Sequence, residues 1–201
     1  MTLTQAFDKK QKKDLQEGIR HSLWHRGYLR HILLPKQKEV YDFFKQSESP
    51  QVVFNCCRQF GKSVLLLTLA FEQCLQNSNQ VVLFVAPTNK QASEIVKQKV
   101  KDILKHKPGD SKVKTTTNPA EIHFDNGSRI IVTGVEVDDG DRARGTSADL
   151  VIMDEASYMS ALSELIDFTI APMTSRTGGR IIISSTPPST QAHDFPQLVN
   201  R

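Results

Sequence analysis

The chain has 201 residues, of which 24% are charged and 38% hydrophobic, a composition typical of one globular domain with its own core. No apolar run approaches the roughly 18 residues that a membrane helix needs, and residues 1–16 lack the apolar stretch of a secretory signal. The net charge is +4, and the three cysteines, at 56, 57 and 74, have no zinc-site spacing, which favours reduced thiols.

Positive charge is concentrated in two stretches. Residues 1–45 carry ten Lys or Arg against five Asp or Glu. Residues 97–114 hold seven lysines and two acids. Such stretches are often solvated surfaces, but they also suit a partner built of phosphates. Charge alone leaves both interpretations open.

The N-terminal region is predicted to be helical. Residues 8–31 have a helical pattern, and a second helix is expected over 36–44, because Pro35 suits a first turn. The sequence Ser-Glu-Ser-Pro at 47–50 then interrupts the chain. We therefore expect a helical arm over residues 1–45 and a core domain over residues 46–201.

From residue 50 onward, short apolar runs alternate with helical patterns. Strands are expected at residues 52–55, 81–85, 150–153 and 180–184, and helices at 62–75, 92–104 and 161–170, the last stopping before Pro172. Two further runs, 121–124 and 129–133, flank a turn of Asp-Asn-Gly-Ser, which predicts a hairpin. The alternation indicates an α/β fold: a mostly parallel sheet with helices on both faces and an inserted β-hairpin.

The loop between the first strand and its helix reads NCCRQFGKS, residues 55–63. A tight loop that leads from a strand into a helix directs backbone N–H groups at one point, which favours an anion. Lys62 can then reach the β- and γ-phosphates of a nucleotide, and the Ser63 hydroxyl can hold Mg²⁺. Cys56 stands where such loops normally have their first glycine. The sequence predicts a phosphate-binding loop with an altered entrance.

Two carboxylates, Asp154 and Glu155, follow the apolar strand at 150–153. Buried charges need partners, so a structural role for both is hard to justify. If this strand lies beside the first one, Asp154 emerges next to Ser63 and can bind the metal. Glu155 can then orient or deprotonate an attacking water. The competing interpretation is an acid pair that caps the next helix.

The last strand ends in hydroxyls, Ser184, Ser185 and Thr186, before a proline. Hydroxyls at the carboxyl end of a buried strand suit the edge of a ligand site in an open α/β sheet. A turn-forming cluster is the alternative. The order along the chain, phosphate loop, acidic strand and hydroxyl strand, favours the site.

These three pieces together resemble the large terminase subunits of tailed bacteriophages, the motors that package DNA into procapsids. The resemblance covers nearly the whole chain and implies a P-loop NTPase fold of the ASCE/RecA-like kind, with ATP and Mg²⁺ as cofactors. That family has a small residue in place of the first glycine and an arginine in the loop. The implied ATP-binding residues of the loop are Cys57, Arg58, Gln59, Phe60, Gly61, Lys62 and Ser63.

The resemblance also implies roles for residues outside the loop. Gln37 matches the position that reads adenine, a task for which an amide has both a donor and an acceptor. Ser184, Ser185 and Thr186 match the motif that couples hydrolysis to movement. Glu155 is the expected water-activating residue, with Asp154 and Ser63 on the metal.

Two arginines have implied catalytic roles. Arg58 is placed to contact the phosphates or tune the catalytic glutamate. Arg144 lies where the family has an arginine that reaches the neighbouring subunit's ATP, and Arg142 competes for that role. A guanidinium suits charge that develops on a transferring phosphoryl group.

The implied setting is the host cytoplasm at the procapsid, without a membrane. Implied partners are double-stranded DNA, the portal protein, the small terminase subunit and further copies in a homo-oligomeric ring. The family has an RNase H-like nuclease domain after the ATPase, whereas this sequence stops at Arg201, so we expect an ATPase piece without nuclease activity.

Two alternatives compete with this interpretation. Asp-Glu-Ala-Ser also resembles the motif of superfamily 2 helicases and translocases, which need a second RecA-like domain for which 201 residues leave no room. A nucleotide-binding switch without fast turnover is the other, and Glu155 argues against it because a binder needs no water-activating carboxylate.

Overall fold

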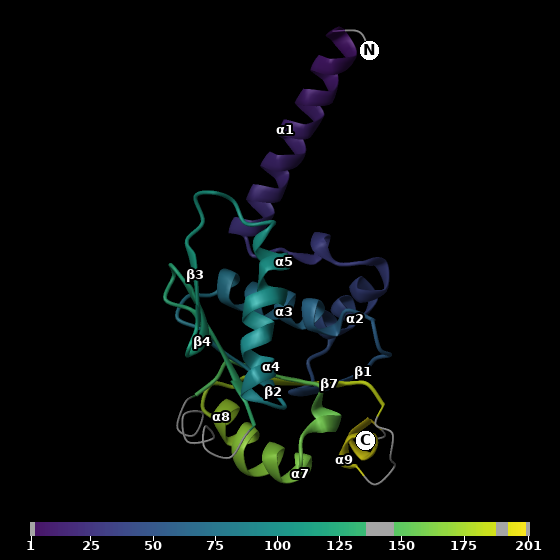
Figure 1. The fold of residues 1–201 in the computed structure, drawn as a ribbon, viewed down its shortest axis with the longest axis vertical. Coiled ribbons are helices and arrows are strands. Elements are labelled where there is room, and N and C mark those ends of the chain that lie inside the picture. The colour runs from purple at the N-terminus through teal and green to yellow at the C-terminus, as the bar shows by residue number, and fades with distance from the viewer. Residues whose placement is uncertain (1–2, 136–146, 188–192, 200–201) are drawn as a thin grey trace.

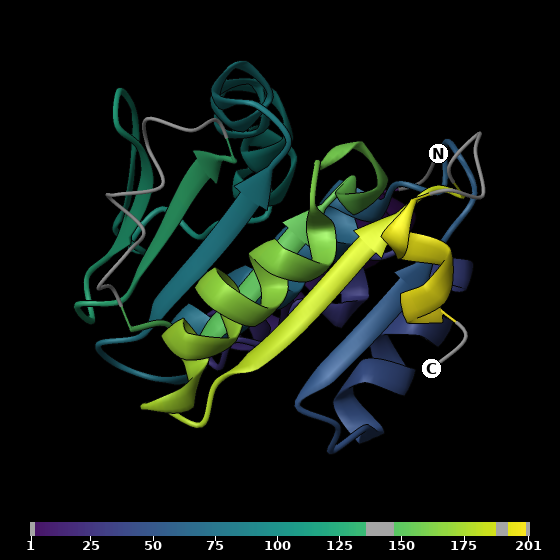
Figure 2. The ribbon, with the colours of Figure 1, turned by 90° about the horizontal axis from the view of Figure 1, so that it is seen from below.

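The computed structural model describes residues 3–135, 147–187 and 193–199. Its centre is a seven-stranded sheet (Figures 1 and 2). The strands, in sheet order, are β1 (Gln51–Asn55), β7 (Arg180–Ser185), β6 (Leu150–Asp154), β2 (Val81–Ala86), β5 (Arg129–Gly134), β4 (Ala120–Phe124) and β3 (Val113–Thr117). The first five are parallel, β4 pairs antiparallel with β5, and β3 pairs antiparallel with β4. The predicted α/β class and the hairpin β4–β5 are confirmed; β3, a polar edge strand, was not predicted.

Helices cover both faces of the sheet (Figure 1). One face carries α2 (Pro35–Gln46), α3 (Lys62–Gln76) and a continuous helical segment of α4 (Asn89–Glu94), a π-helical turn (Ile95–Lys99) and α5 (Val100–Leu104). The other carries α7 (Leu162–Leu165), a second π-helical turn (Ile166–Ile170), α8 (Ala171–Ser175) and α9 (Asp194–Val199). Each face buries its own apolar cluster, since side chains alternate along every strand.

The order of the strands differs from the condition under which Asp154 was placed next to Ser63, although the two residues do meet. β6 does not lie beside β1, because β7 pairs with both of them. Phe54, Ser184 and Asp154 occupy neighbouring register positions at the carboxyl ends of these three strands. The hydroxyl strand therefore separates the phosphate loop from the acidic strand and contacts both.

The helix after the acidic strand also differs from the prediction. It was expected to stop before Pro172, but the helical path continues to Ser175. Pro172 lies in the first turn of α8, directly after the π-helical turn.

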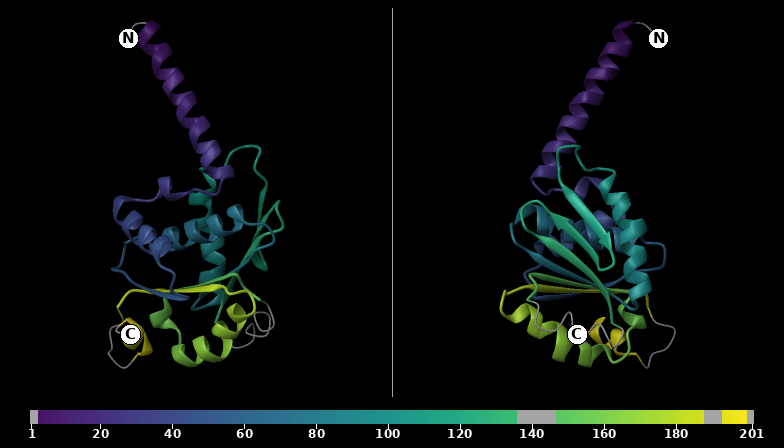
Figure 3. Two further views of the ribbon diagram at one scale, coloured as in Figure 1. Left: turned by 180° about the vertical axis from the view of Figure 1, so that it is seen from behind. Right: turned by 60° about the vertical axis from the view of Figure 1, so that its left-hand side comes forward.

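Helix α1 (Leu3–His25) projects away from the body of the protein (Figure 3). Its side chains from 11 to 22 are exposed, and Trp24 is the first buried residue from position 11 onward. Trp24 and residues of α2 share one apolar cluster with β1 and α3. In the part of the chain that the structure describes, no helix is long and apolar enough to cross a membrane.

Candidate active site

The loop between β1 and α3 holds residues 56–61 in a tight turn. Gln59 and Gly61 have positive φ angles of 62° and 78°, a conformation that glycine adopts readily and other residues rarely. Gly61 immediately precedes α3, whose first N–H groups have no carbonyl partner within the helix. The loop and the start of the helix therefore have a geometry that favours an anion, and phosphate binding at this loop stays a prediction.

Ser63 and Asp154 meet across this edge of the sheet. The Ser63 hydroxyl donates to Asp154 Oδ2 at 2.7 Å, and the Glu155 N–H donates to Asp154 Oδ1 at 3.0 Å. Asp154 is only 3% exposed, and this burial raises the pKa of its carboxyl to about 6. The nearby charge of Glu155 also raises that pKa, whereas the Ser63 hydrogen bond and Lys62 lower it.

Lys62 and Glu155 form an ion pair beside them. Lys62 Nζ lies 3.3 Å from Glu155 Oε1, and the lysine side chain is 7% exposed. Glu155 has a left-handed backbone, with φ of 56°, which is strained for a residue other than glycine. Thr186 Oγ1 makes a long contact of 3.5 Å with Glu155 Oε2. The carboxylate is thus held between the phosphate loop and the end of β7.

The hydroxyls at the end of β7 have different surroundings. Ser185 Oγ lies 2.6 Å from the hydroxyl of Ser157 and accepts a hydrogen bond from its N–H at 3.0 Å. The carbonyl of Ser185 accepts from the N–H of Cys56 at 3.1 Å, so this residue bridges the phosphate loop and the turn after β6. Ser184 Oγ is buried without a hydrogen-bond partner, at the register position beside Asp154.

The remaining predicted residues lie as follows. Arg58 is exposed, and its Nη2 donates to the hydroxyl of Tyr158 at 3.4 Å. Gln37 is 4% exposed and lies directly behind the loop, hydrogen bonded to the carbonyls of Phe60 and Gly61. Arg142 and Arg144 lie outside the described residues.

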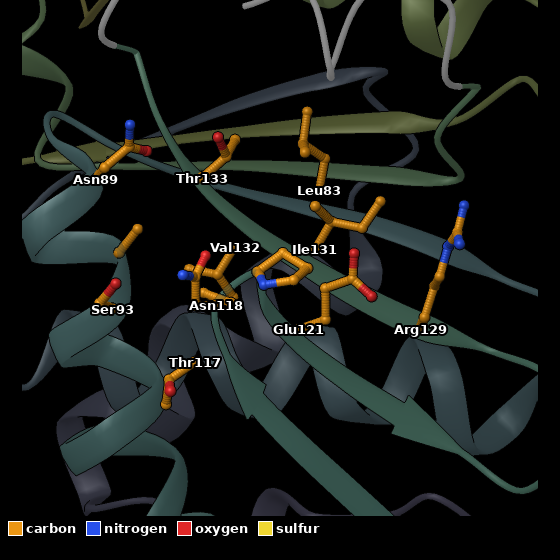
Figure 4. A pocket seen from close by; sticks show the side chains of 13 residues that line it. Leu83, Asn89, Ser93, Thr117, Asn118, Glu121, Arg129, Ile131, Val132 and Thr133 are labelled. Atoms are coloured by element: carbon orange, nitrogen blue, oxygen red, sulfur yellow. The ribbon is translucent and has the colours of Figure 1, made fainter. Parts of the chain in front are cut away.

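A cavity of about 190 Å³ opens at Ser63, Asp154 and Glu155. Its far wall is formed by the end of β2 and by the helical segment α4 to Lys99. A second cavity, of about 290 Å³, is lined by other residues of α4, by the β3–β4 turn and by β5 (Figure 4). It shares no lining residue with the first and contains no residue of the predicted site.

The edge suits Mg²⁺. This ion prefers oxygen ligands, takes one or two carboxylates from the protein, and completes its shell with phosphates and water. Ser63 and Asp154 supply a hydroxyl and a carboxylate, and the unpartnered Ser184 Oγ lies beside them. Among the described residues, no group of three His, Cys, Asp or Glu could form an all-protein cage.

Sequence reasoning missed two contacts. Ser157 and Tyr158 belong to the Asp-Glu-Ala-Ser-Tyr segment but received no role, because their partners Ser185 and Arg58 lie far away in the sequence. Only the insertion of β7 beside β6 brings Ser157 to Ser185. The serine in that segment was the available signal, and the strand order was the missing information.

The parallel sheet, the loop before α3 and the acidic end of β6 define a P-loop NTPase fold. The family model described as "Terminase large subunit, T4likevirus-type, N-terminal" matches residues 53–201. The chain belongs to this family, as the sequence resemblance predicted.

Solved structures agree with this fold. The large terminase ATPase domain of Thermus phage P74-26 is similar over 76% of this chain, with a TM-score of 0.60 and 22% identity. The large terminase of another thermophilic bacteriophage gives 0.62 at 15% identity over 76% of this chain, and that of bacteriophage HK97 gives 0.62 at 17% over 83%. Further structures of the terminase from that second thermophilic phage are complexes with ADP and with ATP-γ-S.

The chain spans only part of these relatives: 65% of the P74-26 domain, 39% of the second thermophilic phage's terminase and 36% of the HK97 terminase. At such identities the likeness shows the fold alone. No curated protein sequence matches the chain. The family match and the solved structures do not favour the helicase alternative.

Proposed function

We propose that this chain binds and hydrolyses ATP with Mg²⁺, and that a large terminase uses this hydrolysis to drive double-stranded DNA into a procapsid. The observation that carries the proposal is the meeting of two pairs at one sheet edge. Ser63 contacts Asp154 at 2.7 Å, and Lys62 contacts Glu155 at 3.3 Å. The Ser63–Asp154 pair suits a metal ion, and the Lys62–Glu155 pair suits a phosphate and the attacking water.

The phosphates of ATP would lie against the loop N–H groups and the start of α3. Lys62 would exchange Glu155 for the β- and γ-phosphates, which leaves the Glu155 carboxylate free. Ser63 and Asp154 would hold Mg²⁺, which neutralises charge on the phosphates when bound. Arg58, exposed at the loop, is proposed to turn from Tyr158 to the phosphates.

Glu155 would act on the attacking water. The water oxygen bonds to the γ-phosphorus, the bond from that phosphorus to the ADP oxygen breaks, and Glu155 accepts the proton of the water. Thr186 already contacts this carboxylate and Ser185 contacts the turn that follows it. The end of β7 is therefore proposed to sense whether Glu155 is paired with Lys62 or with water.

In the assembled motor, Arg144 or Arg142 would serve the ATP of the neighbouring copy in a ring. Double-stranded DNA, the portal protein and the small terminase subunit are the proposed partners, in the host cytoplasm. We propose that residues 1–45 are a helical arm and that residues 46–201 are the ATPase core.

Steady-state hydrolysis and nucleotide binding test the proposal. Glu155→Gln should bind ATP with unchanged affinity but lose at least about a hundredfold in turnover, because a general base contributes roughly 10²–10⁴ in rate. Lys62→Ala should lose most ATP affinity, because it removes the charge that meets the phosphates.

Two exposed residues provide matched controls. Glu164→Gln and Lys13→Ala change the same groups away from the site and should leave both measurements unchanged. Parent-like hydrolysis by Glu155→Gln would contradict the role of that carboxylate. Failure of the parent chain to bind ATP would contradict the proposed function.

A further inference from the structure

The base of helix α1 packs against the segment that connects α5 to β3 (Figures 1 and 3). Trp24 is 1% exposed, and its Nε1 group donates to the hydroxyl of Ser111 at 3.0 Å. His25 Nε2 lies 3.2 Å from Asp110 Oδ2. The two basic stretches, residues 1–45 and 97–114, are separate in the sequence but therefore meet in the structure.

Two histidines lie at the same junction. The rings of His31 and His106 are nearly perpendicular, at 87°, with centroids 6.2 Å apart. Burial is the main reason why the pKa of His106 is lowered, and repulsion from His31, Arg20 and Lys105 lowers it further. Arg20 belongs to α1 and Lys105 follows α5. Cations from both basic stretches therefore act on one point, where the electrostatic potential is positive.

The carboxylates nearby do not cancel this charge. Asp102 is already paired with Lys105 at 2.5 Å, and Asp110 with His25. Three exposed cations at the junction have no carboxylate within ion-pair distance among the described residues: Arg20, Arg26 and Lys112. The junction therefore presents uncompensated positive charge to the solvent.

The junction is fixed to the far end of α3. Gln76, the last residue of α3, donates from Nε2 to the carbonyl of Gly27 at 2.7 Å. A Cβ atom added at Gly27 would lie 2.6 Å from Gln76 Cγ, so the two residues pack closely. Helix α3 has 15 residues and begins at Lys62, which places the phosphate loop roughly 20 Å from the junction along this helix. The cations therefore lie on a fixed part of the fold and outside the nucleotide site.

Exposed cations without acidic partners suit a chain of phosphates. Duplex DNA carries one negative charge per about 1.7 Å of its axis, and proteins neutralise these charges with Lys and Arg. We propose that the basic junction, formed by Arg20, Arg26, Lys105 and Lys112, binds the phosphate backbone of double-stranded DNA. This inference rests on the proposed function for the identity of the partner and adds the surface that contacts it. Phosphate contacts position DNA without reading its sequence.

The test measures binding of the chain to a fluorescently labelled DNA duplex by anisotropy, without nucleotide, at KCl concentrations from about 50 to 200 mM. Arg20→Gln and Lys112→Gln should each weaken binding. Each should also make the slope of log K against log [KCl] shallower by about 1, because one phosphate contact is lost, and the double variant by about 2. The loss should be equal for two duplexes of unrelated sequence.

Arg176 provides the matched control. It is exposed and follows α8 on the opposite face of the sheet, so Arg176→Gln removes the same charge away from the junction. This variant should leave the affinity and the slope unchanged. All substituted side chains are exposed, and circular dichroism checks that each variant keeps the parent's fold.

Two results would overturn the inference. One is a parent chain that does not bind the duplex at about 50 mM KCl, which would make an acidic protein the better partner for the junction. The other is binding by Arg20→Gln and Lys112→Gln that is no weaker than binding by Arg176→Gln. ATP hydrolysis is judged separately, because the DNA measurement contains no nucleotide. A parent that binds DNA through the junction but does not bind ATP would contradict the proposed function and leave the DNA surface in place.

Discussion

The carboxyl group of Asp154 is buried, and this burial makes metal and nucleotide binding at the site depend on pH. Burial is the main reason why its pKa rises to about 6, from an ordinary value of 3.8. Burial disfavours the charged form because it loses its hydration, so without a cation the neutral form predominates below about pH 6. Mg²⁺ and a nucleotide should therefore bind less well as the pH falls below about 6.

This pKa predicts a stability effect in the protein without metal or nucleotide. The folded chain holds the Asp154 proton more tightly than the unfolded chain does. Its contribution to stability is therefore fully present below about pH 4 and is lost as the pH rises through about 6. The amide of an Asp154→Asn variant cannot ionise, so the parent should lose about 2 kcal/mol relative to that variant between pH 4.5 and pH 7.5.

Urea unfolding at the two pH values measures this difference. The amide of the variant keeps an oxygen for the Glu155 N–H, and its NH2 group can donate to the Ser63 hydroxyl, which in the parent donates to Asp154 Oδ2. An equal gap between parent and variant at both pH values would contradict the raised pKa.

At the scale of single residues, the sequence predicted which side chains lie at the site better than it predicted their detailed conformations and contacts. Ser63, Lys62, Asp154 and Glu155 were expected together, and the structure places them together. The left-handed backbone of Glu155 could not be predicted, because a glutamate after an apolar strand carries no signal for φ above zero. The roles of these residues in catalysis stay predictions until the variants are measured.

At the scale of elements, the chain order of strands was predictable but their order in the sheet was not. Apolar runs and helical periodicity identified β1, β2, β6 and β7, since buried parallel strands are continuously apolar. The position of β7 between β1 and β6 depends on crossover connections, which local pattern does not reveal. Polar β3 has no apolar pattern, and it forms only because β4 offers an edge.

Glu72 joins three elements behind the site. This carboxylate on α3 is 0% exposed, and it accepts from the N–H of Leu29 at 2.6 Å and the hydroxyl of Tyr41 at 2.7 Å. Lys45 Nζ lies 3.1 Å away. Burial raises the pKa of Tyr41, so its hydroxyl remains a donor. The contacts fix α2, and with it Gln37, against the helix that follows the phosphate loop.

Removing this carboxylate should be costly. Glu72→Ala leaves two buried donors and a lysine without their acceptor, and we expect a loss of about 3 kcal/mol or more in the free energy of unfolding. Tyr41→Phe removes one hydrogen bond and should cost about 1 kcal/mol. Chemical denaturation measures both, with exposed Glu17→Ala as a control expected within about 0.5 kcal/mol of the parent. Equal losses in the free energy of unfolding for Glu72→Ala and Tyr41→Phe would argue against the interpretation that Glu72 stabilises the fold through all its partners together.

At the scale of the whole molecule, the fold brings the phosphate loop, the hydroxyls of β7 and the two carboxylates together at one edge of the sheet. The carboxyl ends of β1, β7 and β6 supply the loop, the hydroxyls and the carboxylates. The projecting α1 remains a candidate for contact with DNA or a partner (Figure 1). The basic stretch at 97–114 is another candidate, although its beginning, up to Lys99, also lines the cavity at Ser63 and Asp154.

The most direct test of this account is a crystal structure of the chain with ATP-γ-S and Mn²⁺, which stands in for Mg²⁺ and is located by its anomalous signal. The account predicts one metal position, with Ser63 Oγ in its coordination shell and Asp154 bound directly or through one water. It also predicts that Lys62 Nζ has left Glu155 for the phosphates. A metal located away from Ser63 and Asp154, or a nucleotide whose phosphates do not lie against residues 57–63, would contradict it.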